Sequence, residues 1–184
     1  MKKHSNINSG SIEVICGSMF SGKTEELLDR ITEVKSENLK IAIYKPKIDN
    51  RYDETNIVSH NKNSVKAIVV ADAEEILNYD TDVDVIAIDE AQFFNDSLVK
   101  ISNLLANKGI RIIISGLDMD FQGIPFGPIP KLLAISESVT KVHATCVDCG
   151  SQANYSFRKD ADSSLIRLGE EKDYKALCRN CFNQ

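Results

Sequence analysis

Eight residues near the amino terminus have the types and spacing of a phosphate-binding loop. Residues 17–24 read GSMFSGKT and fit the pattern G-x-x-x-x-G-K-[ST] between a strand-like run and a helix-like run. Glycines let such a loop curl so that its N–H groups point at phosphate oxygens. Lys23 is then predicted to reach the β- and γ-phosphates of a nucleoside triphosphate, and the Thr24 hydroxyl to ligate Mg²⁺. The predicted triphosphate-binding residues are Gly17, Ser18, Met19, Phe20, Ser21, Gly22, Lys23 and Thr24.

A second nucleotide-binding signal is an apolar run, residues 83–88, that ends in Asp89 and Glu90. A carboxylate at the carboxyl edge of a parallel sheet is expected to face the Mg²⁺ of a bound triphosphate, so Asp89 is the predicted metal-side residue. Glu90 could act as a general base that takes a proton from the nucleophile attacking the γ-phosphate. The pair alone does not distinguish a kinase, whose nucleophile is a substrate hydroxyl, from an ATPase, whose nucleophile is water.

Four cysteines form two C-x-x-C pairs with 28 residues between them. Four thiolates at this spacing can converge tetrahedrally on one Zn²⁺, and a structural site of this kind would stabilise a segment with little core of its own. The alternatives are a redox-active dithiol in one pair, or His143 in place of one sulfur ligand. The remaining cysteine, Cys16, lies in an apolar run and is predicted to be an inert core residue. The predicted metal ligands are Cys146, Cys149, Cys178 and Cys181.

The composition limits the classes of function. A chain of 184 residues suits one α/β domain with a small appendage, and a net charge of -5 argues against a general nucleic-acid binder. Residues 1–10 are predicted to be a disordered tail rather than a signal peptide, and no apolar run reaches the length of a membrane span. The expected location is the cytoplasm, where thiols stay reduced and available to metals.

Alternating strand-like and helix-like runs predict the elements that must position these residues. Such alternation is typical of a mainly parallel sheet with helices on its faces, and loops on this scaffold carry function. Strands are predicted at residues 12–16, 40–44, 65–70, 83–88 and 110–115, and helices near residues 23–37, 72–78 and 96–108. Near residue 140 the pattern changes to short segments punctuated by the cysteine pairs. We therefore predict a nucleotide-binding α/β domain over residues 11–140 and a metal-binding domain over residues 141–184.

The motifs together resemble one family. The phosphate loop, the run ending DEAQFF, the segment GLDMDFQGIPFG at residues 116–127 and the paired cysteines resemble the type II thymidine kinases in order and spacing, from about residue 11 to residue 184. This resemblance implies a RecA-like P-loop fold with a small zinc-binding lasso domain, and transfer of the γ-phosphoryl group of ATP to the 5′-hydroxyl of thymidine. It also implies Mg²⁺, structural Zn²⁺, a homotetramer and feedback inhibition by thymidine triphosphate.

The resemblance further implies roles for individual residues. Glu90 matches the catalytic base, with Asp89 and Gln92 beside it near the phosphates and metal. Arg51 matches an arginine near the phosphoryl-transfer site, where a guanidinium could stabilise charge on the transferring group. Phe121 is the expected stacking partner of the base, and the loop around residues 165–169 is expected to read the polar edge of thymine with main-chain groups. The nucleoside-binding residues implied in this way are Met19, Phe93, Leu117, Phe121, Ser156, Arg167, Gly169 and Tyr174.

Three positions depart from the family pattern. Ser156 stands where relatives often have threonine near the thymine methyl, and a pocket for one methyl is worth only about 1 to 3 kcal/mol, so deoxyuridine is expected to be accepted as well. Glu170 replaces a second glycine in the lasso, and Met119 replaces a smaller residue beside the pocket.

Two alternatives remain at this point. One is a P-loop ATPase whose zinc ribbon binds nucleic acid or a protein. Residues 141–184 hold seven Lys or Arg and six Asp or Glu, and this near balance is weak support for a ribbon that binds DNA. The other is a catalytically silent, zinc-stabilised binding module.

Overall fold

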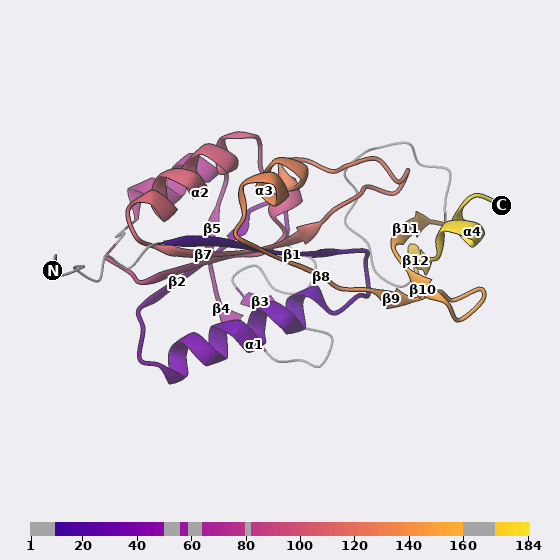
Figure 1. Ribbon diagram of the computed structural model, residues 1–184, viewed down its shortest axis with the longest axis horizontal. Helices are drawn as coiled ribbons and strands as arrows, with labels where there is room; N and C mark the ends of the chain where they lie inside the picture. The colour runs from indigo at the N-terminus through magenta and orange to yellow at the C-terminus, as the bar shows by residue number, and fades with distance from the viewer. Residues whose placement is uncertain (1–9, 50–55, 59–63, 80–81, 160–171) are drawn as a thin grey trace, which may run out of the picture.

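The central feature of the chain is a parallel β-sheet. The computed structural model describes residues 10–49, 56–58, 64–79, 82–159 and 172–184. Within them, a six-stranded sheet has the order β5-β2-β6-β7-β1-β8, and every neighbouring pair is parallel (Figure 1). Because neighbouring strands run in one direction, their carboxyl ends meet at one edge. The strands of this sheet are β1 (Ser11–Gly17), β2 (Ile41–Pro46), β5 (Ile68–Val70), β6 (Val85–Ile88), β7 (Arg111–Leu117) and β8 (Ser138–Lys141).

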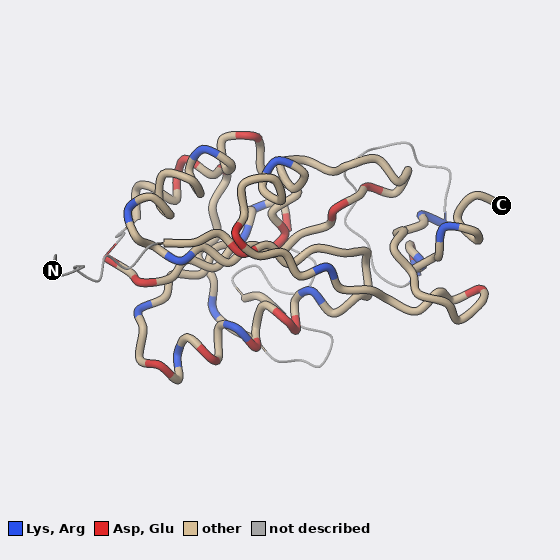
Figure 2. Tube along the Cα trace, viewed as in Figure 1, with Lys and Arg blue, Asp and Glu red and all other residues tan. Residues whose placement is uncertain are grey.

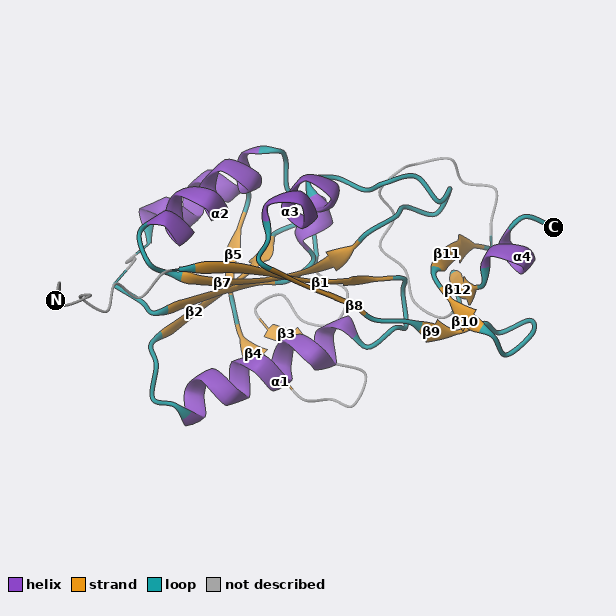
Figure 3. Ribbon diagram, viewed as in Figure 1, coloured by secondary structure: helices purple, strands orange, loops and turns teal. Residues whose placement is uncertain are grey.

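Helices cover both faces of the sheet, as Figure 3 shows. On one face, α2 and α3 pack over a core that contains Val14, Ile112 and Ile114. On the other face, α1 and a small β-hairpin pack over a second core that contains Ile15 and Ile113. Alternate residues of β1 and β7 thus enter opposite cores, which explains why both strands are apolar almost throughout. The covering elements are α1 (Lys23–Ser36), β3 (Asn56–Val58), β4 (Ser64–Lys66), η1 (Ala73–Asn78), η2 (Ala91–Phe93), α2 (Ser97–Asn107) and α3 (Ile129–Ile135).

The structure corrects two of the predicted elements and adds others. The run at residues 65–70 is not one strand: β4 pairs antiparallel with β3, whereas β5 joins the parallel sheet beside β2. The helix expected near residues 72–78 is the 3-10 helix η1, in which the Asp72 side chain accepts a hydrogen bond from the Glu75 N–H. Neither α3 nor β8 was predicted, because α3 is short and preceded by Pro128, and β8 is a largely exposed edge strand.

A separate lobe follows β8. Its short strands form two antiparallel pairs, and its small hydrophobic cluster includes Ala153, Tyr155 and Leu177. We retain the division at about residue 140 as a proposal, which this separate cluster supports. The elements of the lobe are β9 (Ala144–Thr145), β10 (Gln152–Ala153), β11 (Tyr155–Arg158), β12 (Tyr174–Leu177) and α4 (Arg179–Phe182).

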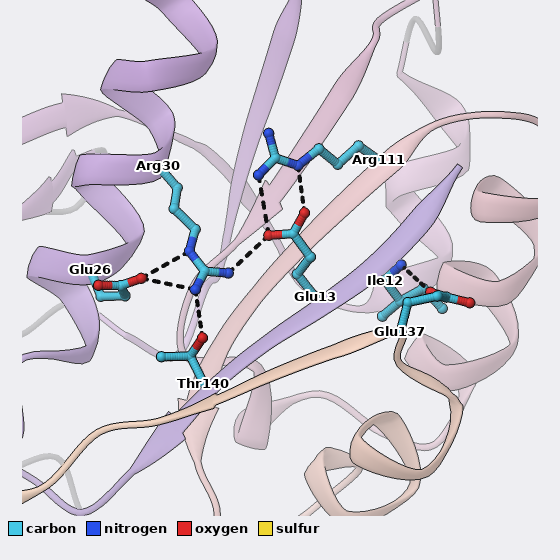
Figure 4. Close-up of polar contacts among 7 residues, drawn as sticks. All are labelled: Ile12, Glu13, Glu26, Arg30, Arg111, Glu137 and Thr140. Carbon is cyan, nitrogen blue, oxygen red and sulfur yellow. Dashed lines mark hydrogen bonds and ion pairs between the residues drawn. The ribbon is translucent and has the colours of Figure 1, made fainter. Parts of the chain in front are cut away.

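An ion-pair network ties α1 to the sheet (Figure 4). Glu13 on β1 accepts hydrogen bonds from Arg30 of α1 at 2.9 Å and from Arg111 of β7 at 2.6 Å. Arg30 also donates to Glu26 and to the Thr140 hydroxyl. The Glu13 carboxylate raises the pKa of Arg111, so this guanidinium stays charged beside its partner. This network ties β1, which carries Glu13, to the start of β7 and to the middle of α1, and β1 and α1 are the strand and helix that flank the phosphate loop.

Charge and apolar length complete the description of the fold. Figure 2 shows acidic and basic residues interspersed along α1 rather than segregated by sign. Among the described residues, no helix has both the length and the apolar character needed to cross a bilayer.

Candidate active site

The predicted phosphate loop lies between β1 and α1, at the carboxyl edge of the sheet. Gly22 has φ of 85° and forms the N-cap of α1, a left-handed conformation that glycine adopts without strain. The Ser21 hydroxyl donates to the Ser18 carbonyl at 2.7 Å, which closes the loop on itself. The N–H groups of the first helical turn therefore open toward the space beyond the sheet, where an anion would be stabilised.

Lys23 is buried within this loop, with 9% of its surface exposed. Its Nζ donates to the Ser18 carbonyl at 2.7 Å, so the ammonium group is held inside the curve of the backbone. The Ser18 hydroxyl is also buried and has no hydrogen-bond partner within the described part of the chain. The loop thus brings a cation and several donors to one point, the requirement for holding a polyphosphate.

Asp89 ends β6 at the same edge of the sheet and is almost fully buried. Burial, and then the neighbouring Glu90 carboxylate, raise the pKa of Asp89 to about 7, while the Ser115 hydroxyl on β7 lowers it. Ser115 lies level with Asp89 because Ile88 pairs with Ile114. A buried carboxylate with this pKa gains strongly from a nearby cation, as the expected metal-side residue should.

Asp89→Asn should change how stability depends on pH. Because the pKa of Asp89 is higher in the folded chain than in the unfolded chain, this group stabilises the fold below about pH 4 and loses that contribution as the pH rises to 7. At pH 8 the variant should therefore be more stable than the parent chain by as much as about 4 kcal/mol, with little difference at pH 4. Urea unfolding without nucleotide or added Mg²⁺ measures this difference.

The exposed Asp29 of α1 supplies the matched control, because Asp29→Asn makes the same chemical change at an exposed position. Equal stability of parent and Asp89→Asn at both pH values would show that Asp89 does not carry the raised pKa.

Glu90 sits in a strained backbone conformation directly after Asp89. Its φ of 50° and ψ of 39° are left-handed, which is uncommon for a residue with a side chain and costs roughly 1 to 3 kcal/mol. Its N–H donates to the Asp89 carboxylate at 2.9 Å, and its own carboxylate accepts a hydrogen bond from the Gln92 side chain at 2.5 Å. The strain and these two contacts together fix the direction of the Glu90 carboxylate.

Gln92 links Glu90 to the neighbouring strand. Its side-chain oxygen accepts a hydrogen bond from the Leu117 N–H at 2.9 Å, while its NH₂ group donates to the Glu90 carboxylate. Only 2% of Gln92 is exposed, and a Cβ on Gly127, at φ of 52°, would lie 2.3 Å from the Gln92 carbonyl oxygen. Gln92 is therefore held in place and connects the predicted base to β7. The sequence predicted Gln92 near the phosphates but did not predict its hydrogen bond to the Leu117 N–H.

The C-terminal lobe meets the phosphate loop through Ser156. The Ser156 hydroxyl accepts a hydrogen bond from the Met19 N–H at 2.9 Å, and only 3% of Ser156 is exposed. Two of the predicted nucleoside-binding residues, far apart in sequence, are therefore in direct contact.

Phe121 projects from a tight turn after β7. The Asp120 side chain accepts hydrogen bonds from the N–H groups of Gln122 and Ile124, and Met119 forms an isolated bridge with Pro125. Phe93, another predicted lining residue, packs edge-on against Phe126 with ring centroids 6.0 Å apart.

Tyr174 and Arg158 form a pair that was not predicted from the sequence. They lie opposite each other on β12 and β11, and the Arg158 Nε and Nη2 donate to the Tyr174 hydroxyl at 3.0 and 2.8 Å. The Arg158 guanidinium also lies 3.8 Å from the centroid of the Phe121 ring. Arg158 thus contacts two predicted nucleoside-binding residues. Three other predicted site residues lie outside the described residues: Arg51, Arg167 and Gly169.

The four predicted metal-ligating cysteines converge. Their sulfur atoms all lie within 4.8 Å of one another, and those of Cys149 and Cys178 are 3.6 Å apart. Sulfur atoms around a tetrahedral Zn²⁺ with bonds of about 2.3 Å would be separated by roughly 3.8 Å, so the cluster could hold a metal ion of this size. Burial opposes ionisation of Cys146, but N–H groups of residues 178, 148 and 149 outweigh it and lower its pKa to about 6.

His143 is not a member of this cluster. Its Nδ1 lies 2.5 Å from the Asn154 side-chain oxygen, and among the described residues the metal-binding group consists of the four cysteines. The alternative with a histidine ligand therefore does not hold.

A phosphate loop, a buried carboxylate and a fixed glutamate at one edge of a parallel sheet define a P-loop nucleotide-binding enzyme with a cysteine-rich lobe. The sequence model of the thymidine kinase family matches residues 10–182. The chain belongs to the thymidine kinase family.

Individual relatives give the same assignment. A thymidine kinase of Porphyromonas gingivalis is 53% identical over 178 residues, covering 97% of this chain and 87% of that protein. A thymidine kinase of Bacteroides fragilis is 50% identical over 175 residues, covering 95% and 88%. A third, from Rhodothermus sp., is 46% identical over 173 residues, covering 94% and 81%. The chain is thus an ATP-dependent kinase that uses thymidine, which decides between the kinase and the ATPase.

Solved structures resemble the chain more distantly. Domain III of the replication initiation protein DnaA from Thermotoga maritima has a TM-score of 0.46 at 19% identity, covering 73% of this chain and 55% of that chain. The ATPase DotB from Legionella pneumophila has a TM-score of 0.42 at 14% identity, covering 69% and 34%.

Proposed function

We propose that Glu90 is the general base of thymidine phosphorylation. In this mechanism its carboxylate accepts the proton of the thymidine 5′-hydroxyl as the oxygen attacks the γ-phosphorus of ATP, and ADP leaves. The observation that carries the proposal is the Gln92 hydrogen bond to Glu90, which is itself anchored to the Leu117 N–H. It holds one carboxylate oxygen in place and so fixes the direction of the group that is to take the proton.

The phosphates and their metal are assigned to the other end of the site. The family implies a divalent cation with ATP. We propose that this ion is Mg²⁺, held by the Thr24 hydroxyl and on the Asp89 side, while residues 17–24 bind the phosphates and Lys23 neutralises their charge. Its chemistry would be to withdraw charge from the β- and γ-phosphate oxygens. We retain Arg51 as the residue that stabilises charge on the transferring group, and Gln92 beside the phosphates as well as beside Glu90.

The nucleoside is assigned to the space between the two domains. We propose that the thymine ring stacks on Phe121 and that Ser156 lies beside its methyl group. The Met19 contact with Ser156 supports this placement, because it joins the phosphate loop to the lobe at that point. The full set of proposed nucleoside-binding residues is Met19, Phe93, Leu117, Phe121, Ser156, Arg167, Gly169 and Tyr174.

Substrate selection tests this proposal. Because one methyl group is worth about 1 to 3 kcal/mol in a pocket, kcat/KM for deoxyuridine should be within roughly 10- to 200-fold of that for thymidine. Deoxycytidine reverses a donor and an acceptor at the base edge and should be disfavoured by about 10⁴-fold or more, because buried polar groups would stay unpaired. Monophosphate formation from each nucleoside, with a nucleoside-free control for ATP hydrolysis, gives these ratios. Equal use of deoxycytidine would contradict the proposed reading of the base edge.

We further propose that the metal of the cysteine cluster is Zn²⁺, since four thiolates favour it. A cytoplasmic location is also proposed, where such thiolates stay reduced. The resemblance to type II thymidine kinases supports a homotetramer and feedback inhibition by thymidine triphosphate, which carries both the base and a phosphate chain. The negative net charge supports the absence of a nucleic-acid partner.

A further inference from the structure

A buried arginine joins the two domains beside the proposed nucleoside site. Arg158 lies on β11 of the lobe, and only 5% of its surface is exposed. Its guanidinium carbon lies 3.8 Å from the centroid of the Phe121 ring, which belongs to the α/β domain. Removing a guanidinium from water is costly unless its donors and its flat face find partners. The sequence places this charge here despite the cost, so its contacts need a specific explanation.

The contacts of Arg158 are directional on both sides. Its Nε and Nη2 donate to one atom, the Tyr174 hydroxyl oxygen, at 3.0 and 2.8 Å. Its guanidinium carbon lies 5.4 Å from the Tyr174 ring centroid, farther than from Phe121. The flat face of the guanidinium therefore packs on the Phe121 ring, and its edge donates hydrogen bonds to the Tyr174 hydroxyl. A lysine could supply the charge at this place but not the flat stack and the paired donors together.

Both partners of Arg158 are themselves fixed. Phe121 follows Asp120, whose side chain accepts two backbone N–H groups of the turn. Tyr174 pairs with Arg158 across the antiparallel β11 and β12 strands. Arg158 thus locks the position of one aromatic ring relative to another across the boundary between the domains.

We propose that Arg158 is a positioning residue that presents Phe121 and Tyr174 to the nucleoside. By covering one face of the Phe121 ring, it leaves the opposite face to stack on the base. By filling the acceptor positions of the Tyr174 oxygen, it makes that hydroxyl a donor toward any further partner. This inference rests on the proposed placement of the nucleoside beside Phe121.

The test compares Arg158→Met and Arg158→Lys in the full chain. Loss of the stack and of two charged hydrogen bonds should raise KM for thymidine by about tenfold in Arg158→Met, and by less in Arg158→Lys. The KM for ATP and kcat should both stay within about twofold, because the role proposed for Arg158 is to position Phe121 and Tyr174 rather than to act on the phosphates. Arg179→Met is the matched control: Arg179 also stacks on a tyrosine, Tyr155, but is exposed on α4. It should leave all three constants unchanged.

A double-mutant cycle shows whether Arg158 acts through Tyr174. If it does, Tyr174→Phe combined with Arg158→Lys should raise the thymidine KM by less than the product of the two single changes. An unchanged or lowered thymidine KM in both arginine variants would overturn the inference, and a lowered value would show that the guanidinium occupies the base-stacking face. If Phe121→Ala also left that KM unchanged, the proposed nucleoside site itself would be wrong. An effect of Phe121→Ala without an effect at Arg158 would overturn the inference alone.

Discussion

Glu90→Gln should lower kcat for thymidine phosphorylation by about 10²- to 10⁴-fold, the range that a positioned general base contributes. The amide has nearly the same shape as the carboxylate but cannot take the proton of the attacking hydroxyl. The KM values for thymidine and ATP should change little, because the proposed role of Glu90 is in the reacting state rather than in binding. Initial-rate kinetics at saturating Mg²⁺ and ATP measure the effect.

The control for this variant is Glu33→Gln, the same chemical change on the exposed face of α1, which should keep the parent rate. Thermal unfolding of Glu90→Gln separates a chemical effect from a folding defect. A correctly folded variant with near-normal kcat would show that another group accepts the proton.

Loss of the metal from the cysteine cluster should unfold the C-terminal lobe. A structural Zn²⁺ contributes on the order of 10 kcal/mol or more. Among the described residues of the lobe, the hydrophobic cluster that could replace it is the small one around Ala153, Tyr155 and Leu177. Cys178→Ser should therefore abolish thymidine phosphorylation, because Ser156, Arg158 and Tyr174 lie on strands of the lobe. ATP binding should persist, since the phosphate loop lies on the parallel sheet with its own two cores.

For parent and variant, metal analysis measures the metal content, circular dichroism the folding of the lobe, and ATP titration the binding of ATP. The parent should hold about one Zn²⁺ per chain, the content of a four-cysteine site. Cys16→Ala is the matched control, because Cys16 is buried in β1 outside the cluster and its loss should leave the metal content intact. Metal-free parent protein with a folded lobe and full activity would contradict the structural role.

The sequence predicted best those features that arise from neighbouring residues. The phosphate loop, the apolar strands β1, β6 and β7 and the two C-x-x-C pairs are local patterns with a single physical explanation each. The prediction of a single strand at residues 65–70 was wrong, because the apolar pattern does not reveal that the chain changes its strand partner near Ala67. The edge strand β8 is mostly exposed and carries no such pattern.

Contacts between distant residues could not be predicted in the same way. Gln92 meets Leu117, and Arg158 meets Phe121, only because the fold brings separate segments together. An arginine in a short polar segment resembles any surface charge until its burial is known. His143 shows the converse: it is near the cysteines in sequence, which made it an alternative ligand, but its ring nitrogen faces Asn154.

The contact between Ser156 and Met19 would tie the proposed choice of base to the proposed binding of ATP. The same hydroxyl that anchors the phosphate loop sits on the residue assigned to the thymine methyl. An engineer who enlarges the base pocket with Ser156→Ala would also free a backbone amide of the loop, whereas Ser156→Thr keeps the hydroxyl and adds only a methyl group. Serine and threonine are the two residues with a short hydroxyl that could keep the hydrogen bond to the Met19 N–H. A change of base preference that keeps this hydrogen bond must therefore be made at other positions.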